Sequence, residues 1–245
     1  MSDYRGYPQA SPRAGAAMDL GLRAYMQRVY NYMAVGLGLT GIVAYAAYSA
    51  AVLPDGRTLT PFGQTLFHGP VMIVLMLLTL GLVFTMSMAM QRMSVATAQM
   101  VFWGYAALNG LTFSALGLAY TGASIGRVFL ITAATFASAS LYGYVTKRDL
   151  SAFGSFLFMG LIGLIIASLV NIFFVSTAVQ WALSVIGVLL FTGFTVYDTQ
   201  VIKSTYYEGD DSLTMGHKAI FGALRLYLDF INLFLSFLRI FGDRR

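Results

Sequence analysis

Seven long apolar stretches alternate with short polar connections along this chain. Each stretch is close to the length of about 20 residues that a helix needs to cross the hydrocarbon core of a bilayer. The pattern therefore predicts an all-α membrane protein with seven transmembrane helices, at residues 29–53, 70–90, 95–120, 128–145, 153–175, 179–202 and 219–241.

The seventh stretch carries charged residues inside its apolar run. Steps of three or four residues place five polar side chains on one helix face: Arg225, Asp229, Asn232, Ser236 and Arg239. Ionisable groups within a membrane span are costly and usually face a bundle interior or a water-filled cavity. We therefore expect this helix to pack among the other spans. Besides Asp229, we expect Arg225, Asn232 and Ser236 to line a pathway.

The stretches divide the chain into three parts. Residues 1–28 are rich in Pro, Gly and Ala, lack the apolar core of a signal peptide and predict a flexible tail. Within this tail, residues 18–28 could form a short helix on the membrane surface or a solvated lead-in to the first span. Residues 29–241 form the transmembrane domain, and residues 242–245 form a short basic tail.

The basic residues predict the orientation, because Lys and Arg are retained on the cytoplasmic side of membranes. If the last stretch crosses fully, nine basic residues lie on the side of the N-terminus and five on the other side. The N-terminus is therefore expected in the cytoplasm. A re-entrant last stretch would improve the charge asymmetry, whereas its length favours a full crossing.

The composition agrees with a membrane protein. Hydrophobic residues make up 58% and charged residues 10% of the chain, whereas charged residues make up about a quarter of a soluble domain. The net charge of +5 could suggest a nucleic-acid partner, but the basic residues lie in short connections, as topology signals do. We therefore expect the lipid bilayer, and no nucleic acid, as a partner.

Several kinds of chemistry are excluded or disfavoured by the residues present. The chain has no cysteine, and His68 and His217 lie in connections on opposite sides of the membrane. HExxH and P-loop patterns do not occur. A retinal protein would need a lysine within a span, whereas Lys203 and Lys218 lie at span ends. We expect neither an enzyme nor a bound cofactor.

Asp198 and Asp229 are the strongest candidates for a functional pair. At a rise of 1.5 Å per residue, Asp198 lies about 12 Å below an interface marked by Tyr206 and Tyr207, and Asp229 about 15 Å below the start of its span. Two apposed carboxylates in a low-dielectric site tend to share a proton and titrate together. The pair is therefore a candidate proton sensor.

Two other interpretations of these carboxylates remain open. Each could satisfy a separate neighbour, with Asp229 paired to Arg225 and Asp198 paired to Arg92 or to a helix end. An intramembrane aspartyl protease also uses two carboxylates, but neither Asp here lies in the Gly-x-Gly-Asp context of that class.

Two segments of the chain resemble a known family. Tyr197-Asp198-Thr199-Gln200, together with residues 226–234 (LYLDFINLF), resembles the Bax inhibitor-1 family of transmembrane Bax inhibitor motif proteins. The short Arg244-Arg245 tail is more similar to bacterial members, which implies a bacterial inner (plasma) membrane.

The resemblance implies a seven-helix fold with the last helix at its centre and a pH-sensitive calcium leak. It implies that Asp198 and Asp229 form the pH sensor and that an arginine from the second span, matched here by Arg92, acts as a latch. Calcium and protons would then be the ions handled. Calcium takes six to eight oxygen ligands, so two carboxylates and Asn232 predict weak, transient binding of a permeant ion.

The alternative function is that of a membrane interaction protein that transports nothing. Such a protein would modulate a membrane-bound protease or a stress or cell-death response through membrane protein partners. The polar face of the last span favours ion transport through a calcium channel or leak, whereas the basic N-terminal tail favours interaction.

Overall fold

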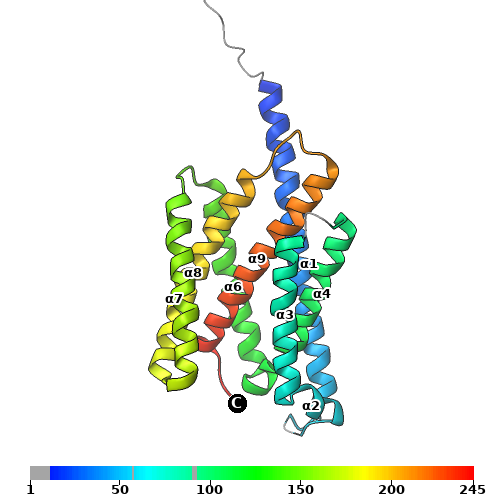
Figure 1. The fold of residues 1–245 in the computed structure, drawn as a ribbon, viewed down its shortest axis with the longest axis vertical. Helices are drawn as coiled ribbons and strands as arrows, with labels where there is room; N and C mark the ends of the chain where they lie inside the picture. Colours follow the sequence, from blue (N-terminus) through cyan, green and yellow to red (C-terminus); the bar gives the residue numbers. More distant parts are fainter. Residues whose placement is uncertain (1–11, 57, 90–92) are drawn as a thin grey trace, which may run out of the picture.

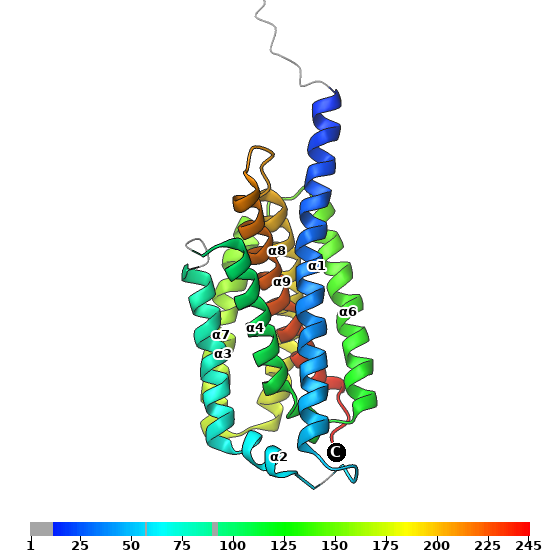
Figure 2. The same cartoon turned by 90° about the vertical axis from the view of Figure 1, so that its right-hand side faces the viewer.

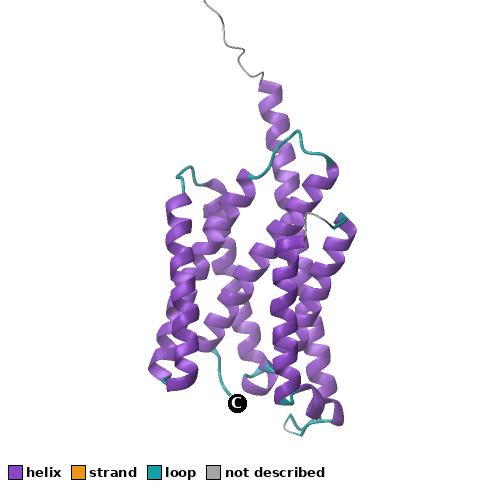
Figure 3. Ribbon diagram, viewed as in Figure 1, coloured by secondary structure: helices purple, strands orange, loops and turns teal. Residues whose placement is uncertain are grey.

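A computed structural model describes residues 12–56, 58–89 and 93–245 of the chain. Helices joined by short loops account for nearly all of this part (Figure 3). The helices in chain order are α1 (Pro12–Ala51), α2 (Pro61–Leu66), α3 (Gly69–Ala89), α4 (Val95–Phe113), α5 (Leu116–Ala119), α6 (Gly122–Val145), α7 (Ser151–Phe174), α8 (Thr177–Ser204) and α9 (Ser212–Phe241).

Seven helical stretches within the described residues are long and apolar enough to cross a membrane, as predicted. Two short helices, α2 and α5, lie in or next to connections. The helix starts follow from local chemistry. Ser94, Thr121, Ser176 and Asp211 each accept a hydrogen bond from the backbone N–H three residues later, at the starts of α4, α6, α8 and α9.

Helix α1 extends across residue 28, where the sequence predicted the boundary between the tail and the first span. It runs without a break from Pro12 to Ala51 and projects beyond the other helices at its N-terminal end (Figures 1 and 2). Residues 18–28 therefore do not form a separate surface helix. Tyr25 and Met26 are buried, and Tyr25 Oη lies 3.3 Å from Thr205 Oγ1. This part of the segment is covered by protein where α8 ends, and lies neither on the membrane surface nor in solvent.

The last helix lies at the centre of the bundle, as predicted. Of the residues in its most apolar stretch, 72% are buried, against 6% for α3 and 11% for α7. It packs against α8, α1, α6 and α4. Aromatic contacts support its position: the Tyr227 ring makes edge contacts with Phe102 and Tyr105, each at 5.7 Å between centroids.

The C-terminus lies at the end of the bundle opposite the start of α1 (Figures 1 and 2). Backbone bonds hold it there, from Arg245 N to Ala119 O at 3.1 Å and from Thr121 N to Asp243 O at 3.1 Å. Helix α9 thus crosses the whole bundle and does not re-enter. Arg127 and Asp243 form an ion pair at 2.9 Å at this end of the bundle. The Asp243 carboxylate thereby offsets part of the basic charge at this end.

Candidate functional site

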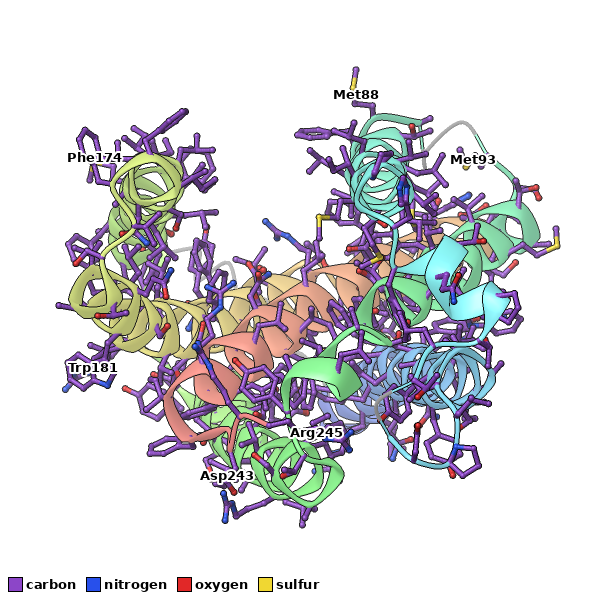
Figure 4. All side chains as sticks on the ribbon, turned by 90° about the horizontal axis from the view of Figure 1, so that it is seen from below. Met88, Met93, Phe174, Trp181, Asp243 and Arg245 are labelled. Atoms are coloured by element: carbon purple, nitrogen blue, oxygen red, sulfur yellow. The ribbon has the colours of Figure 1, made fainter. Side chains whose placement is uncertain are left out.

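A cavity of about 760 Å³ lies between α3 and α7, with α8 and α9 along its wall. Figure 4 looks along the bundle and shows α3 and α7 as two arms, with Met88 and Phe174 projecting outward from them. Most of the lining is aliphatic or aromatic. The polar members of the lining are Ser168, Asp198, Arg225, Asp229, Asn232, Ser236 and Arg239.

Asp198 faces this cavity from α8 and is paired with Arg225 of α9. Arg225 Nη1 lies 3.6 Å from Asp198 Oδ1, which makes an ion pair but exceeds the usual range for a hydrogen bond. The Asp198 side chain is 9% exposed and the Arg225 side chain 35%. The guanidinium also lies over the Phe221 ring, 5.6 Å from its centroid. Arg92, the predicted latch, lies outside the described residues.

Asp229 lies on the same helix as Arg225, one turn further along, and is buried. Its carboxylate interacts electrostatically with both Asp198 and Arg225. Within the described part of the chain, Asp229 Oδ2 and Asp198 Oδ1 have no hydrogen-bond donor. Buried carboxylate oxygens without donors are costly. The two carboxylates and Arg225 therefore form one electrostatic unit with unused acceptor oxygens.

Asn232 and Ser236 extend the polar lining along α9. Asn232 Nδ2 donates to Leu228 O at 2.8 Å, and Ser236 Oγ donates to Asn232 O at 2.7 Å. Both side chains thus use a donor inside the helix, and their oxygens keep lone pairs for a cation or for water. The predicted pathway candidates lie together in one cavity.

A second, more polar cavity of about 550 Å³ adjoins the first at the end that holds the C-terminus. The two linings share Arg239 and Ser168, and the second adds Arg244, Asn171 and Gln180. A path from the aspartate pair to this end would therefore pass two exposed arginines. The helix period places Arg239 on the polar face of the last span, but the sequence does not predict this arginine-lined mouth.

The neighbours of Asp198 in the Tyr-Asp-Thr-Gln segment hold α8 in position. A Cβ atom on Gly154 would lie 2.3 Å from the Tyr197 ring, so α7 approaches this ring closely. Gln200 bonds the loop before α7, donating to Arg148 O at 2.8 Å and accepting from Leu150 N at 3.1 Å. These contacts fix the helix that presents Asp198, a role that the sequence analysis did not assign.

Thr199 joins three helices through a chain of hydroxyl groups. Its Oγ1 donates to Thr195 O, so it accepts from Ser140 Oγ at 2.9 Å, and Ser140 accepts from Tyr30 Oη at 2.7 Å. The chain runs from α1 through α6 to α8. Hydroxyl residues in otherwise apolar spans were the only sequence signal for it.

The match to known proteins covers nearly the whole chain. A family model described as inhibitor of apoptosis-promoting Bax1 matches residues 22–245. The chain belongs to the Bax inhibitor-1 family. This membership confirms the resemblance drawn from the segments around Asp198 and Asp229, and it identifies the chain as a multi-pass membrane protein.

Bacterial relatives align over almost their full lengths with this Bax inhibitor-1 family chain. The inner membrane protein YbhL of Escherichia coli (strain K12) is 48% identical over 238 residues, covering 96% of this chain and 95% of the relative. A protein of Rickettsia prowazekii is 48% identical over 229 residues, covering 93% and 92%. One from Deinococcus radiodurans is 44% identical over 223 residues, covering 91% and 92%.

The described residues of this family member hold no cluster of three or more His, Cys, Asp or Glu side chains that could bind a metal ion. The oxygen ligands that the side chains of the cavity offer are instead two carboxylates, Asn232 and the hydroxyls of Ser168 and Ser236. Such a set can contact a cation but cannot fill the six to eight positions around calcium without water or backbone oxygens.

Proposed function

We propose that the protein is a pH-sensitive calcium leak in which Asp198 and Asp229 form the proton sensor. The observation that carries the proposal is the pair of buried carboxylates, which line one cavity and each hold an oxygen that has no donor among the described residues. In this proposal the protein transports ions and catalyses no reaction. Calcium is the cargo and not a resident cofactor.

The carboxylates support cation transfer because they offer negative charge inside an otherwise apolar cavity. A hydrated divalent ion meets few ligands there, so its binding is weak and its exchange fast. Weak binding favours permeation over storage, since an ion must leave the site as readily as it enters.

Arg225 supports the dependence on pH. With Asp198 ionised, the pair at 3.6 Å ties α9 to α8 and places a positive charge in the cavity. Protonation of the carboxylate pair removes the negative charge that holds Arg225. The guanidinium, 35% exposed, is then free to move away from the pair, which changes both the charge and the shape of the pathway. The predicted latch at Arg92 would act in the same direction from the second span.

We also infer an inner-membrane location with the N-terminus in the cytoplasm. The location is supported by the similarity to the inner membrane protein YbhL of Escherichia coli, and the orientation by the excess of basic residues on the side of the N-terminus.

The proposal is tested by calcium flux into liposomes that contain only the purified protein, over a series of pH values. We expect flux above that of empty liposomes and a dependence on pH. Asp243→Asn is the control for a carboxylate outside the cavity, because Asp243 is exposed and pairs with Arg127.

The second candidate function is interaction with other membrane proteins. It is supported by the N-terminal end of α1, which projects beyond the other helices and so offers a surface to a partner (Figure 2). Flux equal to that of empty liposomes at every pH would contradict the leak and favour this alternative.

A further inference from the structure

A third cavity, of about 450 Å³, also lies near the end that holds the C-terminus. It is formed by α1 and α6, with Phe230 and Phe234 of α9 as its floor. Its described lining shares no residue with that of the aspartate cavity. The lining is almost entirely apolar, so this pocket does not belong to the proposed ion pathway.

Three glycines keep this pocket open. Gly41 of α1 and Gly122 and Gly126 of α6 line it, and a Cβ atom at any of them would meet no atom of the described residues within 4 Å. Glycine at these three positions is therefore not required by the close approach of another helix. A side chain added at these positions would begin in the space of the pocket, with a Cβ atom that displaces no described neighbour.

The pocket faces the bilayer through its side. Tyr45 of α1 and Phe129 of α6 line it and are 75% and 43% exposed. Both residues lie within stretches apolar enough to cross the membrane. The neighbour of such an opening is the hydrocarbon of lipid, not water.

One end of the pocket carries a positive charge. Arg245 is the one charged residue among the described lining, and its Nη1 donates to Tyr48 Oη at 2.8 Å. Its guanidinium carbon lies 5.9 Å from the centroid of the Tyr48 ring. The nearby Asp243 pairs with Arg127 instead, and no acidic side chain among the described residues forms an ion pair with the Arg245 guanidinium. Figure 4 shows Arg245 and Asp243 close together at this end of the bundle.

We propose that this pocket binds one acyl chain of an anionic phospholipid, whose headgroup phosphate is held by Arg245. The volume lies within the range of about 300–1,000 Å³ that is typical of ligand pockets. A guanidinium forms charge-assisted, bidentate bonds with phosphate oxygens. A lipid with net negative charge should be preferred over a zwitterionic one, because the latter brings its own cation to the site.

The test measures lipid retained by the purified full chain in native mass spectrometry, with phosphatidylglycerol and phosphatidylcholine of identical acyl chains. We expect one tightly retained lipid and a preference for phosphatidylglycerol. Gly126→Leu should abolish retention of both lipids. Gly104→Leu is its matched control, because Gly104 on α4 also faces open space but lines neither this pocket nor the aspartate cavity.

The role of the Arg245 charge in the choice of headgroup is tested with separate variants. Arg245→Gln should lower the preference for phosphatidylglycerol about tenfold while retention of a chain persists. Arg244→Gln removes a neighbouring charge that lines the other cavity at this end, and should leave the preference unchanged.

Three results would overturn the proposal. Equal lipid loss in Gly126→Leu and Gly104→Leu would indicate nonspecific surface lipid, and an unchanged preference in Arg245→Gln would remove the headgroup contact. A dimer lost in Gly126→Leu would identify the occupant as a second copy of the chain. If circular dichroism shows that Gly126→Leu does not fold, Gly41→Leu replaces it in the test, because Gly41 lines the same pocket from α1.

Discussion

The Arg225 guanidinium lies 3.6 Å from the Asp198 carboxylate and joins α9 to α8 across the cavity that also holds Asp229. The arginine comes from the same helix as one aspartate and pairs with the other. A change in the protonation of the aspartates therefore alters the strength of an ion pair between the central helix α9 and its neighbour α8.

Removal of this arginine should change both stability and pH response. Because the Arg225 side chain is 35% exposed, the pair is partly screened, and its loss in Arg225→Gln should cost about 1 kcal/mol. Thermal unfolding in detergent should show a midpoint lowered by about 2–4 °C. The pH profile of calcium flux should shift in the same variant.

Arg239→Gln provides the control for Arg225. It removes a charge from the lining of the same cavity, and Arg239 has no ion pair within the described residues. A pH profile shifted equally by both variants would contradict a specific role for the pair with Asp198.

Neutralising either aspartate should flatten the pH response of flux. In Asp198→Asn or Asp229→Asn one carboxylate remains, and the shared proton is lost. The measurement is calcium flux into liposomes from acid to neutral pH, beside Asp243→Asn. Profiles like that of the wild type in both variants would exclude the proton sensor.

If Arg92 acts as a latch, its substitution should change calcium flux differently from the substitution of Arg225. Arg92→Ala should leak at neutral pH and resemble the wild type at acid pH, because the latch is then already released. Arg92→Lys separates a latch from a lipid anchor, since a lysine cannot replace a bidentate guanidinium but can still reach lipid phosphates. Wild-type gating in Arg92→Lys would remove the latch.

The contact between Thr40 and Tyr227 should stabilise the centre of the bundle without affecting the sensor. Thr40 Oγ1 lies 2.9 Å from Ala106 O and 3.0 Å from Gly36 O, so its hydrogen is directed at a carbonyl and Tyr227 Oη donates to it at 2.8 Å. Tyr227→Phe should lower stability by about 1 kcal/mol. Thermal unfolding checks this value, with the exposed Tyr45→Phe as control. A loss of pH response in Tyr227→Phe would contradict a purely structural role.

Gly143 allows α6 to approach α8 closely. A Cβ atom there would lie 2.3 Å from Val196 O, so Gly143→Ala must move backbone and should cost about 1–3 kcal/mol. In Gly163→Ala on α7 the added Cβ meets no atom within 4 Å in the described part of the chain, and stability should be unchanged or slightly raised. Similar unfolding midpoints in the two variants would show that the helices separate more easily than this contact implies.

Much of the fold could be predicted from the sequence because a bilayer permits few solutions. Each span must satisfy its own backbone hydrogen bonds over about 20 apolar residues, so counting such stretches identified the seven crossings. Polar residues on one face of an apolar helix predicted a buried last span. The depths of Asp198 and Asp229 predicted that they belong to one site, and the structure places both in the lining of one cavity.

Only the tertiary structure decided how each helix is rotated about its axis and which helix lies beside it. The sequence allowed Arg225 to pair with Asp229 on its own helix, but rotation of α9 against α8 brings it to Asp198. Likewise, Tyr25 packs against the end of α8, and residues 18–28, predicted as either a surface helix or a solvated lead-in, continue into the first span as one helix. Spacing along one helix determines which residues share a face, whereas the partner of that face is set by packing between residues far apart in the chain.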